Sequence, residues 1–181
     1  MRPNNREVIL RTARELFLEL GYNGISMRTI ASKADLTTGA VYFHFKNKME
    51  IYRTICLEAV DILIEKFKSA VATQNDAQHK LISTYDAYGA FYNENREYYN
   101  LLMEYKSAYG SNQGGEMDEI VEKMKQLMQI MSDALLEGVE NQVYRNIDPI
   151  KLSLLLASVT EGMLQYKKMG IFDAVEVPKT D

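Results

Sequence analysis

The sequence predicts an all-α protein with a three-helix N-terminal head and a larger helical body. Apolar residues recur every three or four positions along most of the chain, and no segment sustains the strict alternation expected of a half-buried strand. Only three prolines, Pro3, Pro149 and Pro178, interrupt the 181 residues. We place the head at residues 1–47 and the body at residues 48–181.

The first helix of the head is expected over residues 5–20. Gly21 follows it, and glycine suits the positive-φ position after a helix end. The face predicted to be buried comprises Ile9, Ala13, Leu16, Phe17 and Leu20.

Two short helices are predicted next, and both are marked by good N-cap residues. Ser26 caps a helix over residues 27–34, and Thr37 caps another over residues 38–45. Two short helices joined by a three-residue turn make a helix-turn-helix.

The body is predicted to contain five helices. The clearest start is Asp148 followed by Pro149, an N-cap with a first-turn proline. The glycine-rich segment "GSNQGG", residues 110–115, is expected to be a flexible loop. The expected ranges are about 48–72, with Asn47 as its cap, then 76–93, 96–108, 117–142 and 149–169.

Charge is distributed unevenly along the chain, although the net charge is only −4. Residues 1–53 carry nine Lys/Arg and five Asp/Glu, a net charge of +4, whereas residues 54–181 carry twelve and twenty, a net charge of −8. A basic segment is a solvated surface or a footprint for an anionic partner. The shape of the head must decide between the two.

Several classes of function find no support in the sequence. The longest apolar run, around "LSLLLASV", is too short to span a membrane, so we expect a cytoplasmic protein without a membrane partner. The single Cys56 excludes an intramolecular disulfide and is expected to be a small buried side chain, and His44 and His79 are the only histidines. We therefore expect no metal and no cofactor. We also expect no enzymatic activity, because the sequence has no Ser-His-Asp set, no paired carboxylates around a glycine-rich loop and no phosphate-binding loop.

The third predicted helix has two chemically different faces. Val41 and Phe45 lie four residues apart and are expected to join the core. Phe43 is open to two interpretations, because its ring can pack inside the protein or contact a partner. The remaining outer face carries few charges and needs a partner; it comprises Thr38, Gly39, Ala40, Tyr42 and, in the second interpretation, Phe43.

Duplex DNA suits this outer face. An α-helix fits the major groove, where the Thr38 hydroxyl can reach base edges and Gly39 lets the backbone come close. Tyr42, His44 and Lys48 can contact phosphate oxygens, and Arg28 could hold the backbone of the opposite strand. The alternative is a helical hairpin whose aromatic rings simply fill a core.

The segment "FLELGYNGISMRTIASKADLTTGAVYFHFKNKMEIY" resembles the helix-turn-helix signature of the tetracycline-repressor-like (TetR) family of bacterial regulators. The shared marks run over residues 9–52: LF, GY, a Ser/Thr cap, IA, A-x-L/V-T, G-A/T-hydrophobic-Y-x-H-F and K-x-x-L/I. The resemblance implies a DNA-binding head, a ligand-binding body and dimerisation through the last two long helices. The DNA-contacting residues that it implies are Thr37, Thr38, Gly39, Ala40, Tyr42, His44 and Lys48.

The body is rich in tyrosine and methionine, particularly along residues 85–109. Tyrosine rings and adaptable methionine side chains suit a cavity for a planar or hydrophobic ligand, although such stripes more often form core. The expected ligand-binding residues are Tyr88, Tyr92, Tyr99, Met103 and Met128.

The last predicted helix is too apolar for a single buried face. Paired with the helix before it, it can form half of an intermolecular four-helix bundle in a homodimer, the alternative being burial within one chain. The expected interface residues are Leu135, Val139, Leu152, Leu155, Leu156, Val159 and Met163.

Together these observations predict a ligand-responsive transcriptional regulator. We expect a repressor that binds a palindromic operator in double-stranded DNA and is released by a small hydrophobic or aromatic effector. The alternatives are an activator of the same fold, and a helical small-molecule-binding or adaptor protein without DNA binding.

Overall fold

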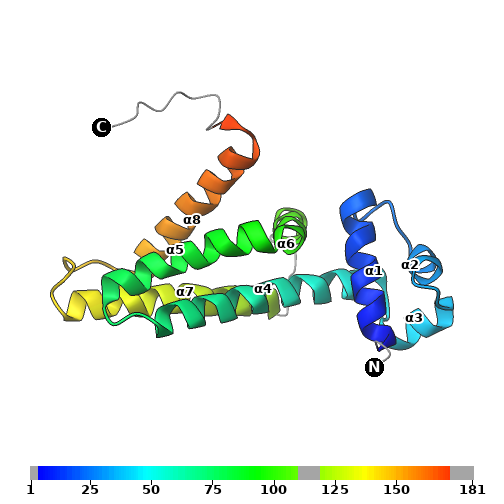
Figure 1. The fold of residues 1–181 in the computed structure, drawn as a ribbon, viewed down its shortest axis with the longest axis horizontal. Coiled ribbons are helices and arrows are strands. Elements are labelled where there is room, and N and C mark those ends of the chain that lie inside the picture. Colours follow the sequence, from blue (N-terminus) through cyan, green and yellow to red (C-terminus); the bar gives the residue numbers. More distant parts are fainter. Residues whose placement is uncertain (1–3, 110–118, 172–181) are drawn as a thin grey trace. The chain divides into compact units, whose positions relative to one another are not determined.

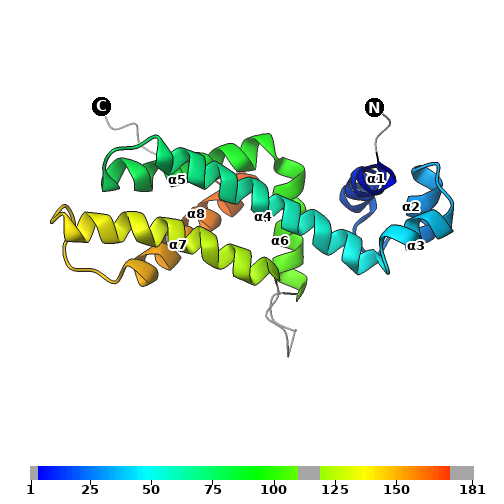
Figure 2. The same cartoon turned by 90° about the horizontal axis from the view of Figure 1, so that it is seen from below.

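The computed structural model describes residues 4–109 and 119–171, and these residues form helices and no strand (Figures 1 and 2). The predicted all-α class is therefore confirmed. The helices are α1 (Asn5–Leu20), α2 (Met27–Lys33), α3 (Thr38–His44), α4 (Lys48–Ala72), α5 (Ala77–Glu94), α6 (Arg96–Tyr109), α7 (Glu119–Glu140) and α8 (Pro149–Lys168).

The predicted helix starts agree with the observed caps. The side chains of Asn4, Ser26 and Thr37 each accept a hydrogen bond from a backbone N–H in the first turn of the helix that follows. Asp148 does the same for α8. Helix α5 begins one residue later than expected, because the carboxylate of Asp76 caps it by accepting the His79 N–H at 2.9 Å.

The predictions for the α6–α7 connection are only partly tested. The expected flexible loop at 110–115 and the predicted start of α7 at 117 lie outside the described residues. The other end of α7 comes at Glu140 rather than at Gln142, because Gln142 has a positive φ of 59° and cannot continue the helix.

By packing, the chain divides into two compact units, which we call the first and the second unit. The first unit comprises Met1–Lys66 and Tyr88–Met124, and the second comprises Phe67–Ala87 and Lys125–Asp181. The first unit thus holds α1, α2, α3 and α6 together with most of α4. The domain boundary expected between residues 47 and 48 stays a prediction.

The core of the head is nearly the predicted one. Helix α1 buries Ile9, Leu10, Thr12, Ala13, Leu16 and Phe17. The prediction that Leu20 belongs to the core is wrong, because its side chain is 49% exposed. It is the last residue of α1, and the chain turns away at Gly21, which has the expected positive φ of 69°.

Three aromatic rings join α1, the loop after it and α4. The Phe17 ring packs edge to face on Tyr52 at 4.8 Å and stacks on Tyr22 at 5.8 Å between centroids. Tyr52 is completely buried, and its hydroxyl donates to the Leu101 carbonyl of α6 at 3.2 Å. Because a buried hydroxyl needs a partner, this bond ties α4 to α6. Cys56, also on α4, is buried as expected.

A second link joins α1, α4 and α6. Arg14 of α1 lies 3.3 Å from the Glu97 carboxylate and 4.6 Å from the centre of the Tyr98 ring. The Tyr98 hydroxyl donates to Glu58 of α4 at 3.1 Å. Burial, and next the neighbouring Glu58 charge, raise the pKa of Tyr98, so this phenol stays protonated and remains a donor.

In the second unit, the loop after α7 folds back onto the end of that helix. The backbone N–H groups of Val143 and Tyr144 both donate to the Gly138 carbonyl, at 2.9 and 3.0 Å. The Tyr144 ring then occupies the space beside Gly138: a Cβ built there would lie 2.2 Å from a ring carbon and 3.2 Å from the Cβ of Ala77. Glycine is therefore needed at this position by packing.

We expect Gly138→Ala to destabilise the protein by about 1–3 kcal/mol, because the new methyl group displaces the Tyr144 ring. The matched control is Gly89→Ala in α5, where a Cβ meets nothing within 4 Å. This control should be neutral or stabilising by up to about 1 kcal/mol, since alanine favours helix over glycine. Urea denaturation of both variants measures the difference, and equal stabilities would contradict the packing argument.

Candidate nucleic-acid interface

The turn between α2 and α3 is tight and keeps the two helices side by side with α1 (Figure 1). The Leu36 N–H donates to the Ala31 carbonyl at 2.9 Å, and Asp35 takes a positive φ of 55°. This conformation costs free energy for a residue with a Cβ. The Thr37 hydroxyl then accepts the Ala40 N–H at 3.1 Å and starts α3.

Helix α3 has the two faces that its sequence predicts. Val41 and Phe45 are 0% and 2% exposed, so both belong to the core. On the opposite side Tyr42 is 53% exposed and Phe43 is 85% exposed. The open question about Phe43 is thereby answered, because its ring does not pack inside the described protein. We call Thr38, Gly39, Ala40, Tyr42 and Phe43 the outer face of α3.

Glycine at position 39 has no explanation within the fold. Gly39 is exposed, its φ is not positive, and the nearest atom to an added Cβ would be the Thr37 hydroxyl oxygen at 3.9 Å. Alanine would fit there and would favour the helix. The absence of a side chain therefore points to an object outside the chain that comes close to the backbone.

Lys48 is engaged within the first unit. Its ammonium group donates to the carbonyl oxygens of Tyr22 and Ile25, at 2.5 and 2.8 Å, and lies 4.1 Å from the centre of the Tyr22 ring. Partial burial lowers the pKa of Lys48. The structure thus gives Lys48 the role of holding the loop before α2 against the start of α4, and its contact with phosphate stays a prediction.

The start of α4 is fixed by a reciprocal cap. The Asn47 side chain accepts the Glu50 N–H at 2.9 Å, and the Glu50 carboxylate accepts the Lys46 N–H at 2.6 Å. Asn47 was predicted as the cap of this helix, whereas Glu50 was not predicted, although the spacing of three residues is the signal for such a pair. The cap fixes the direction in which the chain leaves α3.

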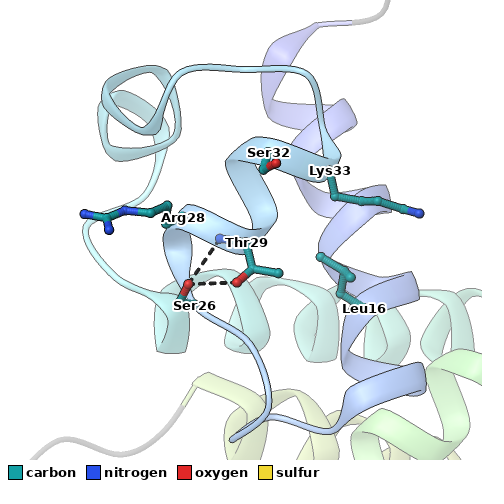
Figure 3. Close-up of a pocket in the computed structure, with 6 residues that line it drawn as sticks. All are labelled: Leu16, Ser26, Arg28, Thr29, Ser32 and Lys33. Carbon is teal, nitrogen blue, oxygen red and sulfur yellow. Dashed lines mark hydrogen bonds between the residues drawn. The ribbon is translucent and has the colours of Figure 1, made fainter.

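A groove of about 550 Å³ runs along α2 beside α1 and was also missed from the sequence. It is lined by Leu16, Ser26, Arg28, Thr29, Ser32 and Lys33. Figure 3 shows Arg28 and Lys33 projecting to opposite sides of α2, while the Ser26 and Thr29 hydroxyls hydrogen-bond each other at 2.8 Å. Only Arg28 of this set was expected as a DNA contact. Lys33 is a second exposed cation on the same helix.

The predicted ligand-binding residues fall into both units. Tyr88, Tyr92 and Tyr99 meet in the first unit: the Tyr99 ring contacts Tyr92 at 4.9 Å and Tyr88 at 6.5 Å, both edge to face. Met103 is half-buried in the same unit, and Met128 is half-buried in the second unit. Tyr92 and Tyr99 are 2% and 0% exposed, so they form core, and their role in ligand binding stays a prediction.

Three of the seven predicted dimer residues are exposed in the single chain. Leu155, Val159 and Met163 of α8 are 58%, 50% and 53% exposed, and Leu152, Leu156 and Val139 are half-buried. Leu135 differs, since it is 1% exposed and packs inside its own chain. The expectation missed further exposed apolar residues of the same helix, Ile150, Leu154 and Tyr166.

Within residues 4–109 and 119–171 no helix has the length and apolar character needed to cross a bilayer. Among the same residues no group of three or more His, Cys, Asp or Glu side chains comes together as a metal site would require.

A capped pair of short helices on α1, with an uncovered outer face on the second, defines the class of helix-turn-helix proteins. Residues 9–55 match the sequence family described as "Bacterial regulatory proteins, tetR family". Over these residues the head of the chain thus carries the sequence of the TetR family.

Individual relatives are similar over different parts of the chain. The transcriptional activator FasR of Mycolicibacterium smegmatis is 29% identical over 57% of this chain and 47% of its own length. The transcriptional repressor BepR of Brucella suis is 46% identical over 28% of this chain and 24% of its own. The matches thus span about half or less of these two proteins.

A solved structure agrees over a longer stretch. The TetR family regulator PfmR of Thermus thermophilus superposes with a TM-score of 0.72 at 25% identity, over 87% of this chain and 85% of its own.

The Gly39→Ala variant is expected to separate folding from DNA binding. It should stabilise the free protein by about 0.5 kcal/mol, because alanine favours the helix and fits the available space. It should lower the affinity for duplex DNA by about tenfold, the cost of roughly one mismatched base pair, because the methyl group intrudes where the backbone approaches DNA. Thermal denaturation and fluorescence anisotropy measure the two effects. Unchanged DNA affinity would mean that α3 does not approach DNA at Gly39.

Proposed function

We propose that the protein is a ligand-responsive, sequence-specific transcriptional regulator that binds DNA as a homodimer in the bacterial cytoplasm. The outer face of α3 carries the proposal, because it is an uncovered helix face of hydroxyl, aromatic and glycine residues on a basic segment. An α-helix of this kind fits the major groove, where hydroxyls reach base edges. The net charge of +4 over residues 1–53 favours the phosphate backbone.

The contacts to DNA divide by chemistry. Thr38 and Phe43 carry groups suited to base edges, whereas Tyr42 and Arg28 carry donors suited to phosphate oxygens. Thr37 has a different position, since its hydroxyl oxygen already accepts the Ala40 N–H as an N-cap. Its hydroxyl proton can still be donated to a phosphate.

Helix α8 supports the homodimer. An apolar face along one helix is unfavourable in water and is typical of a surface that another chain covers. A dimer formed through this face would carry two symmetry-related heads, and two such heads match a palindromic operator. Two linked heads also gain affinity, because the second binds intramolecularly.

We propose repression as the sign of regulation. A dimer that occupies an operator blocks transcription without further contacts, whereas activation requires an additional surface for the transcription machinery. The relatives include both an activator and a repressor by name, so activation is the second candidate.

The effector is proposed to be a small hydrophobic or aromatic molecule bound near the tyrosines of α5 and α6. Tyr88 is half-buried and contacts Tyr99 edge to face, so it has surface left for a planar ligand. Helix α6 also accepts the Tyr52 hydrogen bond, so a ligand that moves α6 changes the support of the head. A coupling free energy of about 1–3 kcal/mol would change operator affinity about 5- to 150-fold.

The direct test is selection from a randomised duplex pool with the wild type and with a Thr38→Ala, Tyr42→Ala double variant. We expect the wild type to enrich a palindrome and the variant, which alters the half-buried Thr38 and the exposed Tyr42, to fold normally and enrich none. The affinity of the wild type should fall steeply with salt, because phosphate contacts release counterions. A wild type that enriches no sequence at low salt would favour the adaptor alternative.

The homodimer is tested by placing charges on α8. We expect a Leu155→Glu, Val159→Glu double variant to be monomeric in sedimentation and to lose at least about tenfold in operator affinity, because carboxylates cannot be buried unpaired. The matched control is Ile82→Glu in α5, which is 47% exposed and outside the proposed interface. A dimeric double variant would rule out this face of α8.

A further inference from the structure

The exposure of Phe43 raises the question of which group on DNA its ring contacts. Phe43 is 85% exposed, the highest value among the exposed large apolar residues of the described chain, and the next is Met169 at 70%. A phenylalanine ring has no donor or acceptor, so it cannot bind phosphate oxygens as Tyr42 can. Its exposure is favourable to the protein only if an apolar group covers it when DNA is bound.

Gly39 lies four residues before Phe43 and therefore on the same face of α3. Side chains of a helix lean toward its N-terminus, so the Phe43 ring extends over the turn that contains Gly39. Because Gly39 has no side chain and only the Thr37 hydroxyl comes within 4 Å of its Cβ position, the space beside the ring is open. The His44 ring makes an edge-to-face contact with the Phe43 ring, at 5.1 Å between centroids and 86° between planes.

An exposed apolar ring beside a residue without a side chain suits a small apolar group. In the major groove the C5 methyl of thymine is the apolar group that base edges offer. Insertion of an apolar side chain between base pairs, the other use of phenylalanine on DNA, belongs to minor-groove binding and does not suit a helix in the major groove.

We propose that Phe43 and Gly39 together read a thymine methyl group, so that each operator half-site carries a thymine facing them. The inference rests on the proposed function and adds to it a base preference with a named pair of residues. Phe43 supplies the apolar wall of the site, and Gly39 supplies the space.

The experiment replaces thymidine in the DNA by deoxyuridine, whose base lacks only the C5 methyl group of thymine. The probe is the duplex that the wild type enriches from a randomised pool, and each thymine is replaced in turn in both half-sites. At one symmetric position the wild type should lose about fourfold in affinity per replaced thymine, the value of burying one methyl-sized group. Phe43→Ala should bind the unmodified duplex and the duplex with deoxyuridine at that position with equal affinity.

Two controls accompany the measurement. Leu20→Ala also removes an exposed apolar side chain from the first unit, at a residue 49% exposed and outside α3, and it should keep the full sensitivity to deoxyuridine. Phe43→Leu retains an apolar side chain and should keep part of the sensitivity to deoxyuridine. Thermal denaturation of Phe43→Ala should match the wild type, because the ring packs on little of the protein.

The outcomes separate this inference from the function on which it rests. A palindrome whose thymines can all be replaced with the same effect on wild type and Phe43→Ala overturns the inference and leaves the regulator intact. A pool from which the wild type enriches nothing overturns both. The inference is supported if deoxyuridine at one symmetric position weakens binding by the wild type but not by Phe43→Ala.

Discussion

The hydrogen bond between the Tyr52 hydroxyl and the Leu101 carbonyl is the contact on which the arrangement of the first unit depends. Tyr52 is 0% exposed, so water does not reach its hydroxyl. A movement of Leu101 that breaks this bond would therefore destabilise the folded protein. The same ring packs on Phe17 and Tyr22, so one side chain contacts α1, the loop after it and α6. A displacement of α6 therefore acts on the head through Tyr52 as well as through the contacts of Arg14 with Glu97 and Tyr98.

Lys48 extends this constraint to the helix-turn-helix. Its ammonium lies over the Tyr22 ring and binds two carbonyls of the loop that leads into α2. The start of α4 and the loop are thus held together on one side, while the reciprocal Asn47 and Glu50 cap fixes the chain where it leaves α3. Both ends of the helix-turn-helix are anchored to α4, and α3 can use Val41 and Phe45 for the core while its outer face stays uncovered.

The parts of this structure that could be predicted from sequence are those with local causes. Caps at Ser26, Thr37 and Asp148 and the end at Gly21 depend on residues within four positions, so helix bounds were predicted within two residues. Leu20 was misjudged because periodicity gives a face and not what covers it, and the place of the buried Leu135 in a dimer stays a prediction. The bonds of Lys48 to residues 22 and 25 cross more than twenty positions, and nothing local indicates them.

Some residues of this chain lower the stability of the fold, and these residues are better candidates for functional sites than residues that pack well in the core. Phe43 exposes a full aromatic ring, Gly39 weakens a helix that would accept alanine, and α8 leaves several large apolar side chains in water. None of these choices helps the single chain to fold, so a partner must explain them. Tyr92 and Tyr99, by contrast, are buried and well packed, and folding alone accounts for them. By this criterion the outer face of α3 and the apolar face of α8 carry the strongest structural support as sites, and the buried tyrosines carry less.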